Sequence, residues 1–108
     1  MTALHLALKQ SEIVTVQSVL RAAVPAHQVF AFGSRVRHDF DSRPVKAHAD
    51  LDIALRGEPL RPVVMFMLRD AFSESDLPFR VDVVMQSDLP SDWLDTIPWL
   101  ELPAWSPG

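Results

Sequence analysis

A chain of 108 residues with 22% charged residues and a net charge of −4 has the composition of one small globular domain. The acidic balance argues against a dedicated nucleic-acid-binding surface, and the absence of cysteine excludes disulfides, a thiolate nucleophile and cysteine-ligated zinc. Residues 1–10 lack the pattern of a secretory signal, and no stretch approaches the roughly 20 apolar residues that span a bilayer. We therefore expect a single domain, residues 1–108, in the cytoplasm.

The first predicted elements are a helix and a short strand. Apolar residues at spacings of three and four from Ile13 to Ala23 predict a helix with Ser11 as its N-cap, ended by Pro25. Residues 29–32 are an apolar strand that ends at a glycine. The polar, proline-containing stretch that follows predicts a loop over residues 35–49.

The second half of the chain predicts two more strands and a second helix. The expected elements are a strand over 50–55, a turn over 56–59, a helix from Pro62 to about residue 74, a strand over 80–85 and a short helical segment over 91–97. The order predicts an α+β domain in which helices flank a small sheet.

The strand that begins at Asp50 carries the most informative residues. Asp50 and Asp52 are two positions apart, so in a strand both carboxylates project from one face. Like charges at this spacing repel one another unless a cation lies between them. Oxygen ligands favour Mg²⁺ or Mn²⁺, which makes this pair a candidate metal site.

A third carboxylate is predicted on the neighbouring strand. Val81 and Val83 face one way, so Asp82 faces the other. If the polar faces coincide, Asp50, Asp52 and Asp82 converge on one point as catalytic and metal-binding residues. That geometry suits in-line phosphoryl or nucleotidyl transfer assisted by two metal ions, with Asp82 as a possible proton acceptor.

The turn before the loop supplies a candidate phosphate site. Gly33 lets the backbone approach a phosphate, and the Ser34 hydroxyl and nearby N–H groups can donate to it. Arg35 and Arg37 are expected to alternate outward and bind phosphate oxygens. With Arg43 and Lys46, they make residues 35–46 basic, which is consistent with binding of a nucleoside triphosphate, although any one of these residues alone would indicate only a solvated loop.

Other kinds of site fit less well. The candidate zinc ligands are His38, Asp39, His48 and Asp50. Their spacing matches no compact zinc-binding motif, so a surface loop is the favoured interpretation. Ser34 lies in no nucleophile elbow, which makes a serine hydrolase improbable, and neither a Walker A loop nor a dinucleotide fingerprint is present.

Three segments together resemble the minimal nucleotidyltransferase (MNT) family of the DNA polymerase β superfamily. They are residues 32–35 (FGSR), 50–55 (DLDIAL) and 81–84 (VDVV). The resemblance implies a polymerase-β-type fold, triphosphate binding at Gly33 and Ser34, and metal binding at Asp50, Asp52 and Asp82. The chain departs from the family in its long loop over 35–49, in Ala49 before the first aspartate, and in His38 where glycine is common.

The family resemblance also implies a reaction and a partner. MNT proteins are often paired with an all-helical HEPN-type protein, either a toxic ribonuclease or a substrate-binding subunit. The implied activity is Mg²⁺-dependent transfer of AMP from ATP to a tyrosine of that partner, which makes the chain an antitoxin and a hetero-oligomer. The chain has no tyrosine of its own to modify.

Two alternatives stay open at this point. One is nucleotidyl transfer to a small molecule, as in aminoglycoside nucleotidyltransferases. The other is a non-catalytic module that masks its partner, which the long loop and the Trp- and Pro-rich tail over 90–108 would favour. The tail holds Trp93, Trp99 and Trp105, which either cap a small core or contact a partner.

Overall fold

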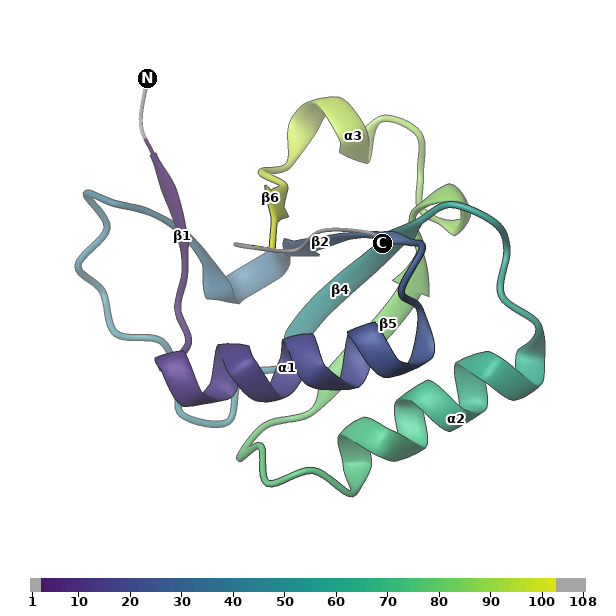
Figure 1. Cartoon of the computed structure of the whole chain (residues 1–108). Helices are drawn as coiled ribbons and strands as arrows, with labels where there is room; N and C mark the ends of the chain where they lie inside the picture. Colours follow the sequence, from purple (N-terminus) through teal and green to yellow (C-terminus); the bar gives the residue numbers. More distant parts are fainter. Residues whose placement is uncertain (1–2, 103–108) are drawn as a thin grey trace.

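The computed structural model describes residues 3–102 and confirms an α+β domain (Figure 1). Its elements, in chain order, are β1 (Leu4–Leu6), α1 (Gln10–Ala23), β2 (Gln28–Phe32), the 3₁₀ turn η1 (Gly33–Arg35), β3 (Val36–His38), β4 (Leu51–Arg56), α2 (Pro62–Ser73), β5 (Val81–Met85), the 3₁₀ turn η2 (Gln86–Asp88), α3 (Trp93–Thr96) and β6 (Leu100–Glu101). No helix within residues 3–102 is long and apolar enough to cross a membrane.

A mixed four-stranded sheet forms the centre of the fold, with the strand order β5–β4–β2–β6. β2 pairs antiparallel with both β4 and β6, whereas β4 and β5 run parallel and are joined through α2. β1 and β3 form a separate antiparallel pair. α1 and α2 lie side by side against one face of the main sheet, and α3 lies on the other side (Figure 1). The arrangement is compatible with the expected polymerase-β-type fold.

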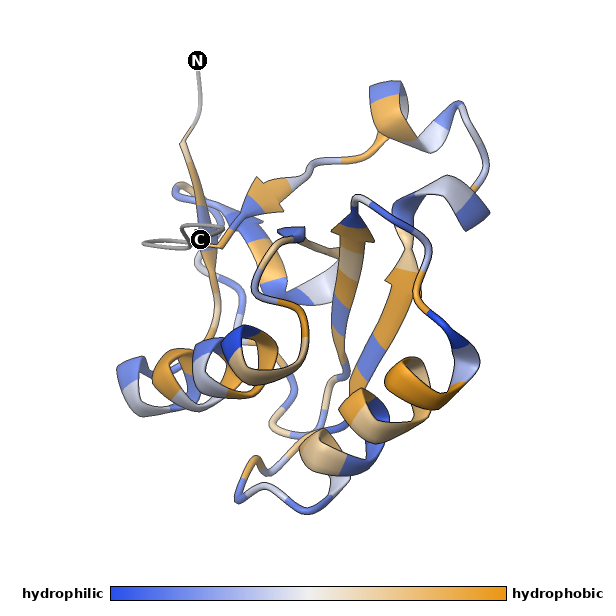
Figure 2. Ribbon diagram, turned by 45° about the vertical axis from the view of Figure 1, so that its right-hand side comes forward, coloured by the Kyte–Doolittle hydropathy of each residue, from blue (hydrophilic) through white to orange (hydrophobic). Residues whose placement is uncertain are grey.

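The core lies between the sheet and the two long helices. Alternate residues of β4, namely Leu51, Ile53 and Leu55, are fully buried on the helix side of the sheet. Their helical partners are the apolar stripes of α1 and α2, and Figure 2 colours apolar residues of these helices and of the strands orange. The buried members of those stripes are Val16, Leu20, Leu68 and Phe72. This packing leaves the other face of β4, with Asp52, directed away from the helices.

α1 begins two residues earlier than the sequence predicts, so the expectation of Ser11 as N-cap is wrong. Lys9 is the N-cap, and its backbone N–H donates to the Glu12 carboxylate at 2.8 Å. Ser11 lies within the first turn, where its carbonyl accepts from the Thr15 hydroxyl. The acidic Glu12 side chain satisfies a backbone donor that a helix start leaves unpaired. α2 does start at Pro62, as predicted.

The predicted loop over residues 35–49 is wrong in its first part. Residues up to 38 form η1 and β3, and β3 pairs with the unpredicted strand β1. β6, with two residues, was also not predicted. Strands of two or three residues show no readable alternation, so only their pairing partners define them. Residues 39–50 remain irregular.

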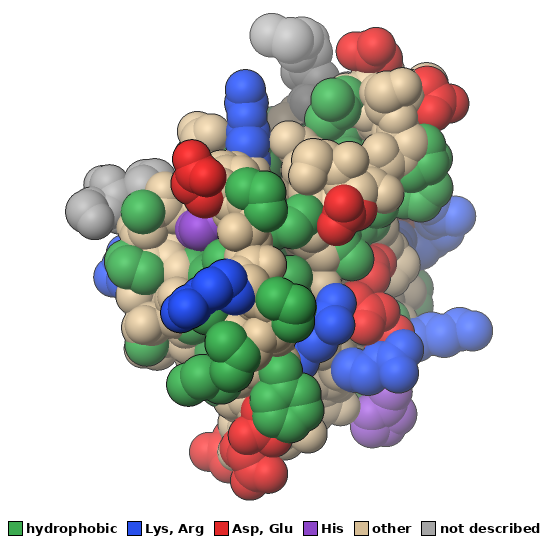
Figure 3. Space-filling model, turned by 90° about the vertical axis from the view of Figure 1, so that its right-hand side faces the viewer, with side chains coloured by type: hydrophobic (Ala, Val, Ile, Leu, Met, Phe, Trp, Pro, Cys, Tyr) green, Lys and Arg blue, Asp and Glu red, His purple; other side chains and the backbone are tan. Residues whose placement is uncertain are grey.

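α2 also exposes large apolar side chains toward solvent. Figure 3 views the molecule from the side on which α2 lies and shows hydrophobic side chains among charged ones on this face. Val63, Phe66 and Met67 of α2 are 55–69% exposed. The helix is therefore apolar on more than its core-facing side.

At one edge of the main sheet, a side chain from α2 caps the strand. β5 is an edge strand, and Arg69 Nη2 donates to the Val83 carbonyl at 2.8 Å. An edge strand presents unpaired backbone groups, and this contact satisfies one of them.

Replacement of Leu20 by alanine should destabilise the fold strongly. Leu20 is fully buried between α1 and the sheet, and such truncations cost about 2–5 kcal/mol because they leave a cavity. Val14→Ala on the exposed side of α1 is the matched control and should change stability by less than about 0.5 kcal/mol. Urea unfolding of both variants checks this, and equal losses would contradict the assigned core face.

Candidate active site

The strand register brings two of the predicted carboxylates together. In the parallel pair of β4 and β5, Asp52 lies directly opposite Asp82. Asp50 lies one residue before β4 and, at two residues from Asp52, belongs to the same face. The side chains of Asp50 and Asp82 are 40% and 52% exposed, and Asp52 is half-buried. All three stand at one end of the sheet, where β4 and β5 both begin.

A guanidinium lies between two of these carboxylates. Arg80 Nη2 donates to Asp50 Oδ2 at 3.1 Å and lies 3.8 Å from Asp82 Oδ2. The hydrogen bond that Arg80 donates to Asp50 raises the pKa of Arg80, and the charges of Asp50, Asp82 and Asp52 raise it further. Sequence reasoning missed Arg80, although it precedes Asp82 by two residues and so shares its strand face.

The sequence predicts that the three carboxylates converge on one point, and in the structure they do not. Within residues 3–102, no three His, Asp or Glu side chains lie close enough to hold a metal ion. Asp52 and Asp82 are register partners, whereas Asp50 is hydrogen-bonded to Arg80. The physical reason is electrostatic: three carboxylates on one face repel, and the guanidinium of Arg80 attracts Asp50 and Asp82.

The donor chemistry of this face nevertheless fits a divalent cation. Its potential metal ligands are carboxylate oxygens, which Mg²⁺ and Mn²⁺ prefer. Burial raises the pKa of Asp52, and the nearby charges of Asp82 and Asp50 raise it further, while Arg80 opposes them. Negative charge on Asp52 is therefore poorly compensated, and an added positive ion near it would be stabilised.

Gly33 places the predicted phosphate turn directly against this face. Its φ of +81° belongs to the left-handed region, and a Cβ on Gly33 would lie 2.3 Å from Asp52 Oδ2. Only glycine allows the backbone to pass so close to the carboxylate. Ser34 follows in η1 and is exposed. The turn and the acidic pair thus adjoin one another, although Ser34 and Asp50, their nearest members in sequence, are 16 positions apart.

Arg35 does not point outward, and that expectation is wrong. It is 5% exposed, and its guanidinium donates to the carbonyls of Ala7, Ala47 and Ala49 at 2.8–3.1 Å. The same group lies 4.1 Å from the ring centroid of Phe79. Burial lowers the pKa of Arg35, and the charge of Glu12 opposes that shift. Arg35 therefore fastens the loop that leads into Asp50.

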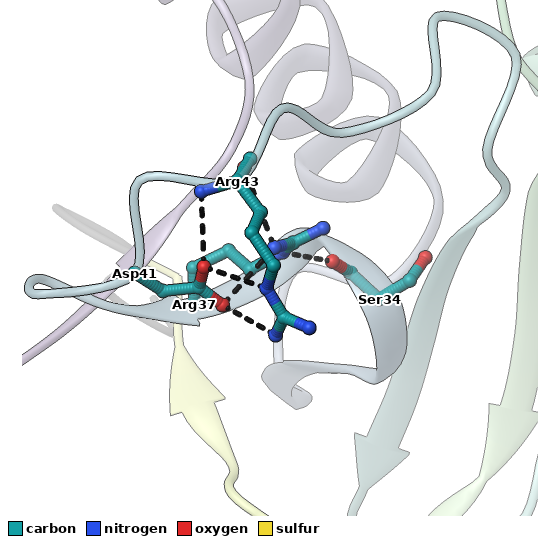
Figure 4. Close-up of polar contacts among 4 residues, drawn as sticks. All are labelled: Ser34, Arg37, Asp41 and Arg43. Carbon is teal, nitrogen blue, oxygen red and sulfur yellow. Dashed lines mark hydrogen bonds and ion pairs between the residues drawn. The ribbon is translucent and has the colours of Figure 1, made fainter.

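Arg37 is also engaged within the protein. Its Nε donates to the Ser34 carbonyl at 2.8 Å, and its Nη1 donates to Asp41 at 3.1 Å. Arg43 binds the same carboxylate through Nε and Nη2 (Figure 4). These hydrogen bonds hold the pKa of Asp41 well below its usual range. Asp41 thus offsets part of the basic charge predicted for residues 35–46.

The alternative zinc ligands are not brought together. Asp39 accepts from His5 Nδ1 at 2.9 Å, whereas His48 Nδ1 lies 3.1 Å from the Pro78 carbonyl. Among the described residues, no histidine and acid cluster fits a metal.

Two of the three tryptophans pack beside the acidic face. The Phe32 ring centroid lies 4.9 Å from that of Trp99 and 6.4 Å from that of Trp93. Phe32 is the β2 partner of Asp52, so this aromatic cluster adjoins the site. Trp93 and Trp99 therefore pack on the sheet through Phe32, while Trp93 stays 36% exposed and partner contact by the tail stays a prediction. Trp105 lies outside the described residues.

Comparison with known proteins yields no matching family model. The chain is 40% identical over 93 residues to the probable protein adenylyltransferase MntA of Haemophilus influenzae, a match that covers 85% of this chain and 71% of that protein. The chain belongs to the MntA-like family. This MntA-like protein is therefore a nucleotidyltransferase, as the acidic face and the adjoining glycine turn led us to expect.

We expect Arg35→Lys to lower the stability of this MntA-like protein by about 2–3 kcal/mol. Lysine keeps the charge but cannot reproduce the planar fork that reaches three carbonyls. Arg43→Lys, at a side chain that is 82% exposed, is the control and should change stability less. If Arg35→Lys were fully stable and raised only the KM for nucleotide, the buried clamp would be refuted in favour of phosphate binding.

Asp52→Asn should raise the thermal midpoint of the metal-free protein at pH 7. Because the fold raises the pKa of Asp52, wild type loses stability as pH rises through that pKa, and asparagine removes the loss. The gain should vanish at a pH below the ordinary aspartate pKa, where Asp52 is neutral in both states. Melting curves in EDTA at several pH values check this against Asp70→Asn on α2. A gain that persists at low pH would show that charge is not its cause.

Proposed function

We propose that this chain is a protein adenylyltransferase that transfers AMP from ATP to a tyrosine of a helical, HEPN-type partner and thereby acts as an antitoxin. The observation that carries the proposal is the contact of the Gly33 turn with Asp52, opposite Asp82. A phosphate-binding turn and the acidic residues that nucleotidyl transfer needs are adjacent. The 40% identical relative, named as a probable protein adenylyltransferase, supports this choice of reaction.

In this proposal, the chain's own groups divide the work between binding and proton transfer. Backbone N–H groups of the Gly33 turn and the Ser34 hydroxyl bind the triphosphate. Asp50, Asp52 and Asp82 would hold Mg²⁺ or Mn²⁺, which would supply positive charge to offset the triphosphate and the leaving pyrophosphate. Arg35 and Arg37 hold the turn in place rather than bind phosphate. Arg37 donates to the Ser34 carbonyl, and Arg35 donates to the Ala49 carbonyl in the loop before β4.

The transfer itself needs an acceptor hydroxyl and a base. The acceptor oxygen bonds to the α-phosphorus of ATP as the bond to the bridging oxygen breaks, and pyrophosphate leaves. Asp82, the more exposed of the two paired carboxylates, accepts the hydroxyl proton and passes it to solvent. The 108 residues contain no tyrosine, so a tyrosyl acceptor lies outside them. The exposed apolar side chains of α2 lie on the other side of the sheet from the acidic face and favour contact with a protein partner there.

A non-catalytic masking module remains the second candidate, favoured by the ion pair that Arg80 makes with Asp50. A masking module would need no open cation site. The two candidates differ in whether Asp52 is required for neutralising the partner.

Incubation with ATP, Mg²⁺ and the product of the neighbouring gene should add an AMP-sized mass to a partner tyrosine. Asp52→Asn should slow this addition by about two orders of magnitude or more, since it removes a charge that binds the metal. Intact-mass analysis and peptide mapping measure the product, and Asp70→Asn on α2 is the control. A partner that is neutralised equally by wild type and Asp52→Asn, without added mass, would favour masking and overturn the enzymatic proposal.

A further inference from the structure

Arg80 is anchored so that its guanidinium stays at the acidic face. Its backbone carbonyl accepts from the Leu51 N–H at 2.9 Å, which ties the residue before β5 to the start of β4. As the residue two positions before Asp82, it projects from the same side of the sheet. From there, its Nη2 reaches Asp50 at 3.1 Å and Asp82 at 3.8 Å. The guanidinium therefore lies beside two of the three carboxylates of the acidic face.

The contacts of Arg80 are close to the carboxylates but weak. Its side chain is 73% exposed, and both contacts are made through a single nitrogen. Exposed ion pairs contribute little to stability and are screened by salt. A divalent ion carries twice the charge and prefers the same carboxylate oxygens. Arg80 can therefore balance the carboxylates and still give way to such an ion.

We propose that Arg80 is a positioning residue that serves as the resident counter-charge of Asp50 and Asp82 and competes with the divalent cation for them. This inference rests on the proposed function, because it takes these carboxylates as metal ligands. In the absence of metal, Arg80 keeps the acidic face from being destabilised by its own charge. Metal binding displaces the guanidinium, so Arg80 sets the metal concentration at which the site becomes loaded.

Direct Mn²⁺ binding, without nucleotide or partner, tests the competition. Titration calorimetry or Mn²⁺ EPR on the full chain at low salt should give Arg80→Gln a Kd about three- to tenfold lower than wild type, because a unit charge a few ångströms from the ion is removed. Arg80→Lys keeps the charge and should stay near wild type. Arg56→Gln is the matched control at the far end of β4, roughly 13 Å from Asp52, and should change the Kd by less than about twofold.

A second readout separates competition from a merely structural role. In EDTA, Arg80→Gln should melt below wild type, and saturating Mn²⁺ should raise its midpoint by more than it raises that of wild type. High salt should reduce the difference in Kd between the two proteins. A structural role alone would lower the midpoint equally with and without Mn²⁺ and leave the Kd unchanged.

The two ways of failing can be told apart. If wild type binds Mn²⁺ but Arg80→Gln binds it no more tightly than Arg56→Gln does, competition by Arg80 is overturned and the proposed metal site stands. If neither wild type nor Asp52→Asn binds Mn²⁺, the metal site of the proposed function is refuted. The proposed role of Arg80 is then refuted as well.

Discussion

The buried guanidinium of Arg35 is the contact on which the site depends. It binds carbonyls at Ala7, Ala47 and Ala49 and stacks on Phe79, so one side chain joins the segment after β1, the loop that enters β4 and the segment that enters β5. Asp50 follows Ala49, and Arg80 follows Phe79. The positions of both residues are thus set by a charge that does not itself face the site. A buried guanidinium needs several acceptors, and here backbone carbonyls supply them.

Around this clamp, the acidic face is arranged by register and by charge. Parallel pairing of β4 and β5 places Asp52 beside Asp82 despite their repulsion. The apolar residues that alternate with these aspartates along each strand must face the helices, and this requirement sets the register. The resulting charge is partly relieved by Arg80, while Asp52 retains a raised pKa. Gly33 leaves room for the carboxylate by lacking a side chain. Core packing and site electrostatics are therefore consequences of the same alternation along two strands.

The sequence predicts the features that follow from periodicity and misses those that follow from tertiary pairing. α1, α2, β2, β4 and β5 were predicted within two residues of their ends, and the outward face of Asp82 was correct, because alternation and helical spacing are local signals. β1, β3 and β6 are too short to carry such a signal. Outward alternation after the glycine turn predicts phosphate binding by Arg35, whereas its burial and its three carbonyl partners show a tertiary contact that no local pattern reveals. Arg80 could have been found from its spacing to Asp82.

The cap on β5 limits how a partner can join this molecule. Peptides commonly extend a sheet by pairing with a free edge strand, using main-chain hydrogen bonds. Here Arg69 already donates to the Val83 carbonyl in the middle of that edge, so an incoming strand would have to displace a charged side chain to align. Recognition of another chain is thereby directed away from backbone pairing at β5 and toward side-chain surfaces. The same contact discourages edge-to-edge pairing of β5 between copies of the chain.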